Sequence, residues 1–133
     1  YRKALNGRPG RVTVMLHTFV HQDPTVVAQI GAGALYEYLD THLDFASARV
    51  SYERVRGLAA ADRGALVDHA VGRYLNGGSL IGTPSHCEAM ARSLKEIGVD
   101  EIACLVDFGV PREHVLPSLV EVASMQAKLN VQR

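Results

Sequence analysis

Two short stretches of this chain hold side chains that could do chemistry. His17, Thr18 and Phe19 lie near the end of one apolar run, and Asp107 lies at the end of another. An imidazole can act as an acid or hydrogen-bond a ligand ring, and a carboxylate can bind substrate or orient a neighbouring group. We therefore take His17 and Asp107 as candidate catalytic residues. Thr18 and Phe19 are candidates for lining a pocket.

Each of these residues has a structural alternative. A buried histidine whose nitrogens are satisfied by neighbouring backbone gives the same sequence pattern as a catalytic one. Phe19 could be ordinary core packing. Asp107 could cap the turn at Gly109. The sequence leaves both readings open for all three residues.

A third candidate site lies at Gly82 and Thr83, directly before Pro84. Threonine at the N-cap and proline at the first helical position predict a helix start. The free amides and the dipole of such a start suit phosphate or another anion. Capping alone explains the same residues, because a single glycine does not make a phosphate-binding loop.

The elements that position these residues form a β-then-α pattern. The two apolar runs show no apolar/polar alternation, which predicts parallel strands covered by helices on both faces. In such folds the chemistry lies beyond the carboxyl ends of the strands. The predicted order is strand, long helical insertion, helix, strand, helix. The first predicted strand is 11–20, and the second follows the helix stop at Gly98 and ends at Asp107. The predicted helices are 23–41, 83–97 and 112–129.

The segment 42–78 is a long connection between the two βα units. Its apolar spacing predicts a helix in pieces, and the polar stretch 54–63 is the candidate for a mobile loop. Because connections of this length are usually functional, we interpret 42–78 as a candidate lid.

Composition excludes several classes of function. The 133 residues carry 14 basic and 14 acidic side chains, which gives no electrostatic footprint for nucleic acid or an anionic membrane. The apolar runs are shorter than the roughly 20 residues that span a bilayer, and the first residues lack a signal core. Cys87 on a predicted helix and Cys104 in a predicted buried strand have no metal-ligand or disulfide-scaffold spacing. These features predict a cytoplasmic domain, or part of one, with no metal site.

Three segments together (14–20, 80–84 and 97–109) resemble the carboxyl-terminal part of luciferase-like flavin monooxygenases. The closest subgroup is that found as internal domains of nonribosomal peptide and polyketide synthetases. The most specific feature is Gly82-Thr83-Pro84 followed by the Gly-Val-Asp-Glu of residues 98–101. The resemblance covers essentially the whole chain.

The resemblance implies a (β/α)8 barrel that uses reduced FMN and molecular oxygen on a carrier-tethered intermediate. Residues 1–133 would then be the carboxyl-terminal part of the barrel, its last two βα units, and inactive alone. Thr18, Phe19, Gly82 and Thr83 become candidate FMN-binding residues. Arg54, Arg56 and Arg63 could meet the phosphopantetheine arm of a carrier protein, although a solvated loop is the alternative.

Two other functions remain open from the sequence. The chain could be a non-catalytic α/β module that self-associates or binds a partner through open sheet edges. It could also be a small-anion-binding domain that uses the helix start at Thr83. The opening residues read as the end of a helix, so we expect the chain to belong to a larger polypeptide.

Overall fold

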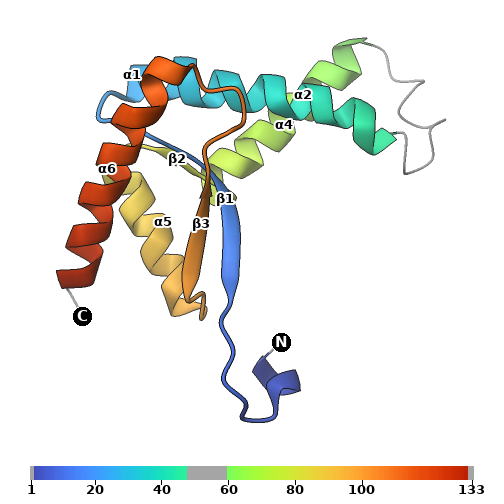
Figure 1. Ribbon diagram of the computed structural model, residues 1–133. Helices are drawn as coiled ribbons and strands as arrows, with labels where there is room; N and C mark the ends of the chain where they lie inside the picture. Colours follow the sequence, from blue (N-terminus) through green and yellow to red (C-terminus); the bar gives the residue numbers. More distant parts are fainter. Residues whose placement is uncertain (1, 48–59, 132–133) are drawn as a thin grey trace.

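A computed structural model describes residues 2–47 and 60–131 of the chain (Figure 1). The elements, in chain order, are η1 (Arg2–Leu5), β1 (Thr13–Val20), α1 (Pro24–Val26), η2 (Val27–Ala32, a π-helical turn), α2 (Gly33–Ser47), α4 (Ala60–Gly77), β2 (Leu80–Gly82), α5 (Pro84–Glu96), β3 (Glu101–Leu105) and α6 (Arg112–Val131).

The three strands form one parallel sheet in the order β2-β1-β3. The amino-terminal part of β1, residues 13–17, pairs with β3, and its last three residues, 18–20, pair with β2. The register at the start of β3 is fixed by Asp100, whose Oδ2 accepts a hydrogen bond of 2.8 Å from the Val12 amide. β1 is therefore the central strand, and its two halves have different neighbours.

The predicted α/β class with parallel strands is confirmed, but the number and order of the strands differ from the prediction. Two strands were expected, and β2 was missed because three residues are too few to show a period. In a (β/α)8 barrel each strand lies beside the next one along the chain. Here β1 lies between β2 and β3, an order that occurs in doubly wound sheets.

Helices cover the two faces of the sheet unequally (Figure 1). Helices α5 and α6 pack on one face, where Val20, Leu80, Cys87 and Met125 form a buried cluster. On the other face, η2, α2 and α4 cover only the part of the sheet near the carboxyl ends of the strands. A second cluster lies there, formed by Phe19, Ala34, Leu35, Ile81 and Phe108.

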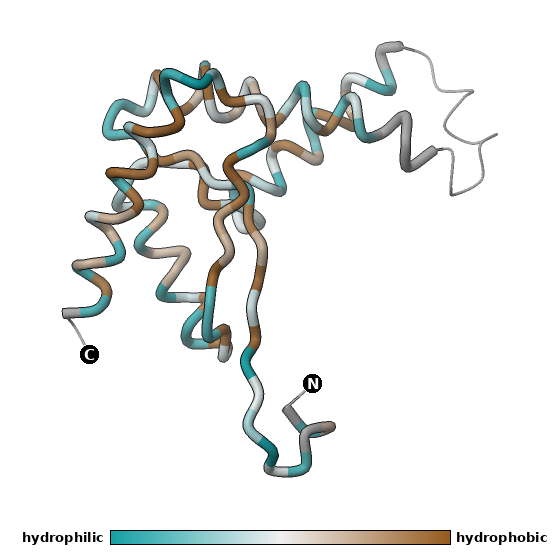
Figure 2. Tube along the Cα trace, viewed as in Figure 1, coloured by the Kyte–Doolittle hydropathy of each residue, from teal (hydrophilic) through white to brown (hydrophobic). Residues whose placement is uncertain are grey.

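The amino-terminal half of the sheet is open on the α2–α4 side. Met15 is 68% exposed, and Ala103, its partner in the register, is also exposed. Figure 2 shows that hydrophobic residues continue along β1 and β3 into this half. The prediction that both strands are covered on both faces is therefore wrong here. Cys104 of β3, predicted to be buried, is exposed.

The predicted helix boundaries are largely confirmed. Asp23 caps α1 by accepting a hydrogen bond of 2.7 Å from the Thr25 amide, and Gly98 ends the α5 segment with φ of 93°. Helix α2 runs past the predicted end at residue 41. Thr83 has the extended backbone of an N-cap, but its hydroxyl lies 3.2 Å from the Ser85 hydroxyl and makes no capping hydrogen bond.

Close packing of η2 on β1 depends on one glycine. A Cβ at Gly31 would lie 2.5 Å from Cδ1 of Phe19 and 3.0 Å from Cγ2 of Ile81. Phe19 and Ile81 are both almost fully buried, so neither side chain has free space to move into. Gly31 thus sets how closely the helical layer approaches the sheet.

Candidate functional site

His17 lies where three separate elements converge on the sheet. It pairs in register with Leu105, the last residue of β3. Its ring makes edge contacts with Tyr38 of α2 at 4.8 Å, Tyr74 of α4 at 5.6 Å and Phe108 after β3 at 5.2 Å, measured between ring centroids. We call these three rings the aromatic enclosure of His17.

One ring nitrogen of His17 is buried inside this enclosure. Within the described part of the chain, Nε2 has no hydrogen-bond partner. Leaving a buried polar atom unpaired costs about 1–3 kcal/mol, so such an atom calls for an explanation. The structural alternative for His17 was that neighbouring backbone groups hydrogen-bond its ring nitrogens. Nε2 has no such bond in the described part of the chain.

The surroundings of His17 favour its neutral form. Burial lowers the pKa of the imidazole, and repulsion by His42 lowers it further. A neutral imidazole can donate or accept one hydrogen bond at Nε2, depending on its tautomer. Nε2 is thus a single polar atom closed off from solvent by aromatic rings, and a ligand group would reach it only when one of these rings moves aside.

Helix α2 supplies two of the groups that act on His17. The rings of Tyr38 and His42 stack with centroids 3.9 Å apart, and His42 Nδ1 lies 2.8 Å from the Tyr38 carbonyl oxygen. This spacing of four residues places both rings on one face of the helix. His17, Tyr38 and His42 consequently form a row that leads from the sheet to the surface.

Thr18 and Phe19, the candidate flavin contacts on β1, lie in the protein interior. The Thr18 hydroxyl donates a hydrogen bond of 2.9 Å to the Leu16 carbonyl oxygen, and Thr18 is 1% exposed. Phe19 is also 1% exposed and belongs to the core cluster. The residues described here do not form a flavin pocket by themselves, because both side chains are already used in packing.

The remaining candidates differ in how close they lie to His17. Asp107 is exposed, although its neighbour Phe108 is part of the aromatic enclosure. Gly82 pairs with Val20, further along β1 than His17, and Thr83 follows it. Gly82 is buried, and a Cβ there would lie 2.7 Å from a carbon of the His86 ring. The structure therefore brings together His17 and the Asp107 segment, but not Gly82 and Thr83.

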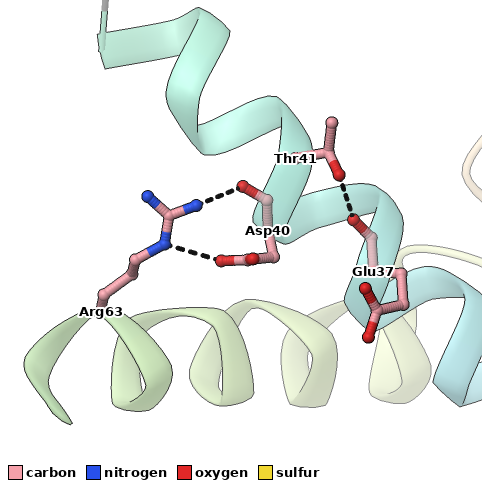
Figure 3. A network of polar contacts seen from close by, with 4 residues as sticks. All are labelled: Glu37, Asp40, Thr41 and Arg63. Atoms are coloured by element: carbon pink, nitrogen blue, oxygen red, sulfur yellow. Dashed lines mark hydrogen bonds and ion pairs between the residues drawn. The ribbon is translucent and has the colours of Figure 1, made fainter. Parts of the chain in front are cut away.

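The structure describes two parts of the candidate lid 42–78, namely the end of α2 from residue 42 and the whole of α4, which packs against α2. Arg63 joins them: its Nε donates to Asp40 Oδ1 at 2.7 Å, and its Nη2 donates to the Asp40 carbonyl oxygen at 2.8 Å (Figure 3). This arginine thus holds α4 against α2. Arg54 and Arg56, the other candidates for contact with a carrier protein, lie outside the described residues.

Sequence reasoning missed the two tyrosines of the site. Tyr38 and Tyr74 fit the apolar spacing of their helices and give no sign that they meet at one histidine. No group of three or more His, Cys, Asp or Glu side chains in 2–47 and 60–131 is placed to hold a metal ion. No helix in those ranges is long and apolar enough to cross a membrane.

Comparison of the chain with protein-family models finds no match. Comparison with curated protein sequences also finds none. Arguments about function therefore rest on the residues and on the geometry around His17.

Proposed function

We propose that this chain forms part of an FMN-dependent, luciferase-like monooxygenase, in which His17 is the polar side chain that the chain contributes to the site. The observation that carries the proposal is the buried, unpaired Nε2 of His17 near the carboxyl end of β3. Active sites of parallel α/β folds lie at this end of the sheet. The activity class comes from the sequence resemblance, and the carrier-tethered substrate comes with it.

The aromatic enclosure gives His17 a defined task in such an enzyme. Tyr38, Tyr74 and Phe108 keep water away from the imidazole, which strengthens a hydrogen bond made at Nε2. With one ring moved aside, a neutral Nε2 could orient a substrate oxygen or nitrogen atom or exchange a proton with it. Oxygen activation is the chemistry of the reduced flavin, and the protein positions the reactants.

Additional polypeptide is part of the proposal. Thr18 and Phe19 are buried, so the flavin would be held mainly by other segments. The open half of the sheet, at Met15 and Ala103, lies on the same face as His17 and is where those segments would pack. A (β/α)8 barrel would place β2 between β1 and β3, so a barrel requires the sheet to pair differently in the complete enzyme.

Substitution of His17 in the complete enzyme tests the proposal. His17→Ala should lower the oxygenation rate about 100-fold, the range for loss of one acid–base group, with a much smaller loss of thermal stability. His69→Ala is the matched control, because His69 is exposed on α4 and is absent from the enclosure. Bound FMN is measured in each variant. Unchanged turnover in His17→Ala, with flavin bound, would remove His17 from the site.

A second candidate function is binding of another polypeptide without catalysis. The observation in its favour is the exposed apolar strip of the sheet, with Met15 68% exposed beside Ala103. An exposed apolar face of this kind can be covered by a packed segment of another polypeptide. Flavin binding with turnover by the complete protein favours the first function. Association of the protein without affinity for flavin favours the second.

A further inference from the structure

Helix α6 is apolar on two opposite faces. Its inner face packs against the sheet and α5 through Ser118, Val122, Met125 and Leu129. A second series, Leu116, Val120, Ala123 and Ala127, repeats the same spacing of four, three and four residues. The two series are offset by two residues, or about 200° around the helix, so they point in opposite directions.

The outer series is exposed to solvent. Leu116 is 72% exposed and Val120 is 68% exposed, and both alanines are also exposed. Helices α5 and α6 together form the outer layer on that side of the sheet (Figure 1). A surface helix normally has one apolar stripe and a polar opposite face, so a second stripe indicates a further packing partner.

We propose that the outer face of α6, defined by Leu116, Val120, Ala123 and Ala127, is the interface through which two copies of this chain form an antiparallel, two-fold symmetric dimer. The size order along the stripe supports this occupant. The large residues lie in the amino-terminal half of α6 and the small ones in the carboxyl-terminal half. In an antiparallel pair, Leu116 meets Ala127 of the second copy, and Val120 meets Ala123 of the second copy.

A parallel arrangement would be less complementary, because it would set leucine against leucine and alanine against alanine. Two-fold pairing of one patch with itself is the commonest symmetry of homo-oligomers. Exposed alanines let two helix backbones approach closely, and the large side chains of one helix then fill the gaps of the other. The stripe is thus complementary to itself in one orientation.

The dipole of α6 favours the same orientation. Glu113 lies in the first turn and Lys128 in the last turn, both exposed. Antiparallel pairing opposes the two helix dipoles and brings Lys128 of one copy toward Glu113 of the other, although Arg112 offsets the acidic charge of that turn. Lys128 lies 3.6 Å from Glu88 and is 60% exposed, so its ammonium group is still accessible at the surface.

The dimer should be weak and concentration-dependent. Helix α6 has 20 residues and is therefore about 30 Å long. One pair of such helices covers less than the roughly 1,200 Å² typical of stable interfaces. The interface lies across the sheet from His17, so it is independent of the proposed function.

The test is sedimentation equilibrium of the full-length protein over a wide concentration range, with a swap of large and small residues. Leu116→Ala and Ala127→Leu should each weaken dimerisation about tenfold, since each change occurs twice in the symmetric pair. The double variant should recover most of the lost affinity, because alanine and leucine again face each other. Ile97→Ala is the control, since Ile97 is 79% exposed but lies outside α6.

Three results would overturn the dimer. The first is a wild-type protein that stays monomeric at all concentrations. The second is stronger association of Ala127→Leu, which would show a non-specific apolar contact. The third is a double variant no better than the single ones. Circular dichroism of each variant verifies that α6 still forms, as expected for exposed positions.

Discussion

The two halves of the sheet are both rich in apolar residues but have different surroundings. Phe19, near the carboxyl end of β1, is 1% exposed, whereas Met15, four residues earlier on the same face, is 68% exposed. Both residues are large and apolar. The difference arises because η2, α2 and α4 lie across the carboxyl ends of the strands and leave the amino-terminal half open on that side (Figure 1).

The comparison shows that the hydropathy of a strand indicates which residues are suited to burial. It does not identify the helix or strand that buries them. The covered half holds a core cluster, and the buried His17 nitrogen lies at its boundary with the open half. The open half has the apolar character of a covered strand without its cover. The proposed site therefore belongs with the first half, and the proposed packing of further polypeptide belongs with the second.

The largest expected effect separates the two halves directly. Phe19→Ala should lower the free energy of unfolding by about 3–5 kcal/mol, because it removes a buried aromatic ring and leaves a cavity. Met15→Ala should change it by no more than about 0.5 kcal/mol, because an exposed side chain loses little. Urea denaturation of the purified chain measures both. A cost for Met15→Ala close to that of Phe19→Ala would mean that the open half is covered.

A smaller effect tests how the helical layer fits the covered half. Gly31→Ala should be destabilising: overpacking against Phe19 costs about 1–3 kcal/mol, which outweighs the roughly 1 kcal/mol gained from better helix propensity. Gly33→Ala is the matched control. A Cβ at Gly33 meets nothing within 4 Å and the backbone is right-handed helical, so this change should stabilise by about 0.4–1 kcal/mol.

Thermal unfolding of the two glycine variants distinguishes the explanations. Opposite shifts of the midpoint show that space beside Phe19 limits position 31. Equal stabilisation by both changes would show that η2 can move away from the sheet, and the close contact would then have no structural importance.

How far the sequence predicts this molecule depends on the range of the interaction. Caps and turns are local, so Asp23 as a helix start and Gly98 as a helix stop were both found. Strand order is not local. β2 and β3 are both apolar, and nothing in their residues states which lies next to β1, so the order β2-β1-β3 could not be derived.

The candidate site shows the same limit. His17 was selected because it lies near the end of a strand, which is a local property. Its aromatic enclosure comes from α2, α4 and the segment after β3, and Tyr38 and Tyr74 carry only the signal of a helical apolar stripe. Thr18 and Phe19 were equally close to the strand end. Their burial depends on helices whose positions the sequence pattern does not give.

The smallest effect concerns the boundary between the two halves, where His17 lies. Burial and His42 lower the pKa of His17 in the folded chain, while in the unfolded chain it is about 6.5. Below that pH the unfolded state binds more protons than the folded state. The contribution of His17 is therefore fully present above about pH 6.5 and is lost as the pH falls from there toward the lowered pKa of the folded chain.

This pH dependence can be measured as the free energy of unfolding of the wild type, His17→Gln and His42→Ala between about pH 7.5 and 5.5. His17→Gln should flatten the curve, because glutamine does not titrate. His42→Ala removes one cause of the lowered pKa, so the loss attributable to His17 should shrink without disappearing. If His17→Gln retains the full slope of the wild type, other groups cause the acid loss of stability. The imidazole would then not be held neutral by its aromatic enclosure, and the boundary would have no special electrostatic character.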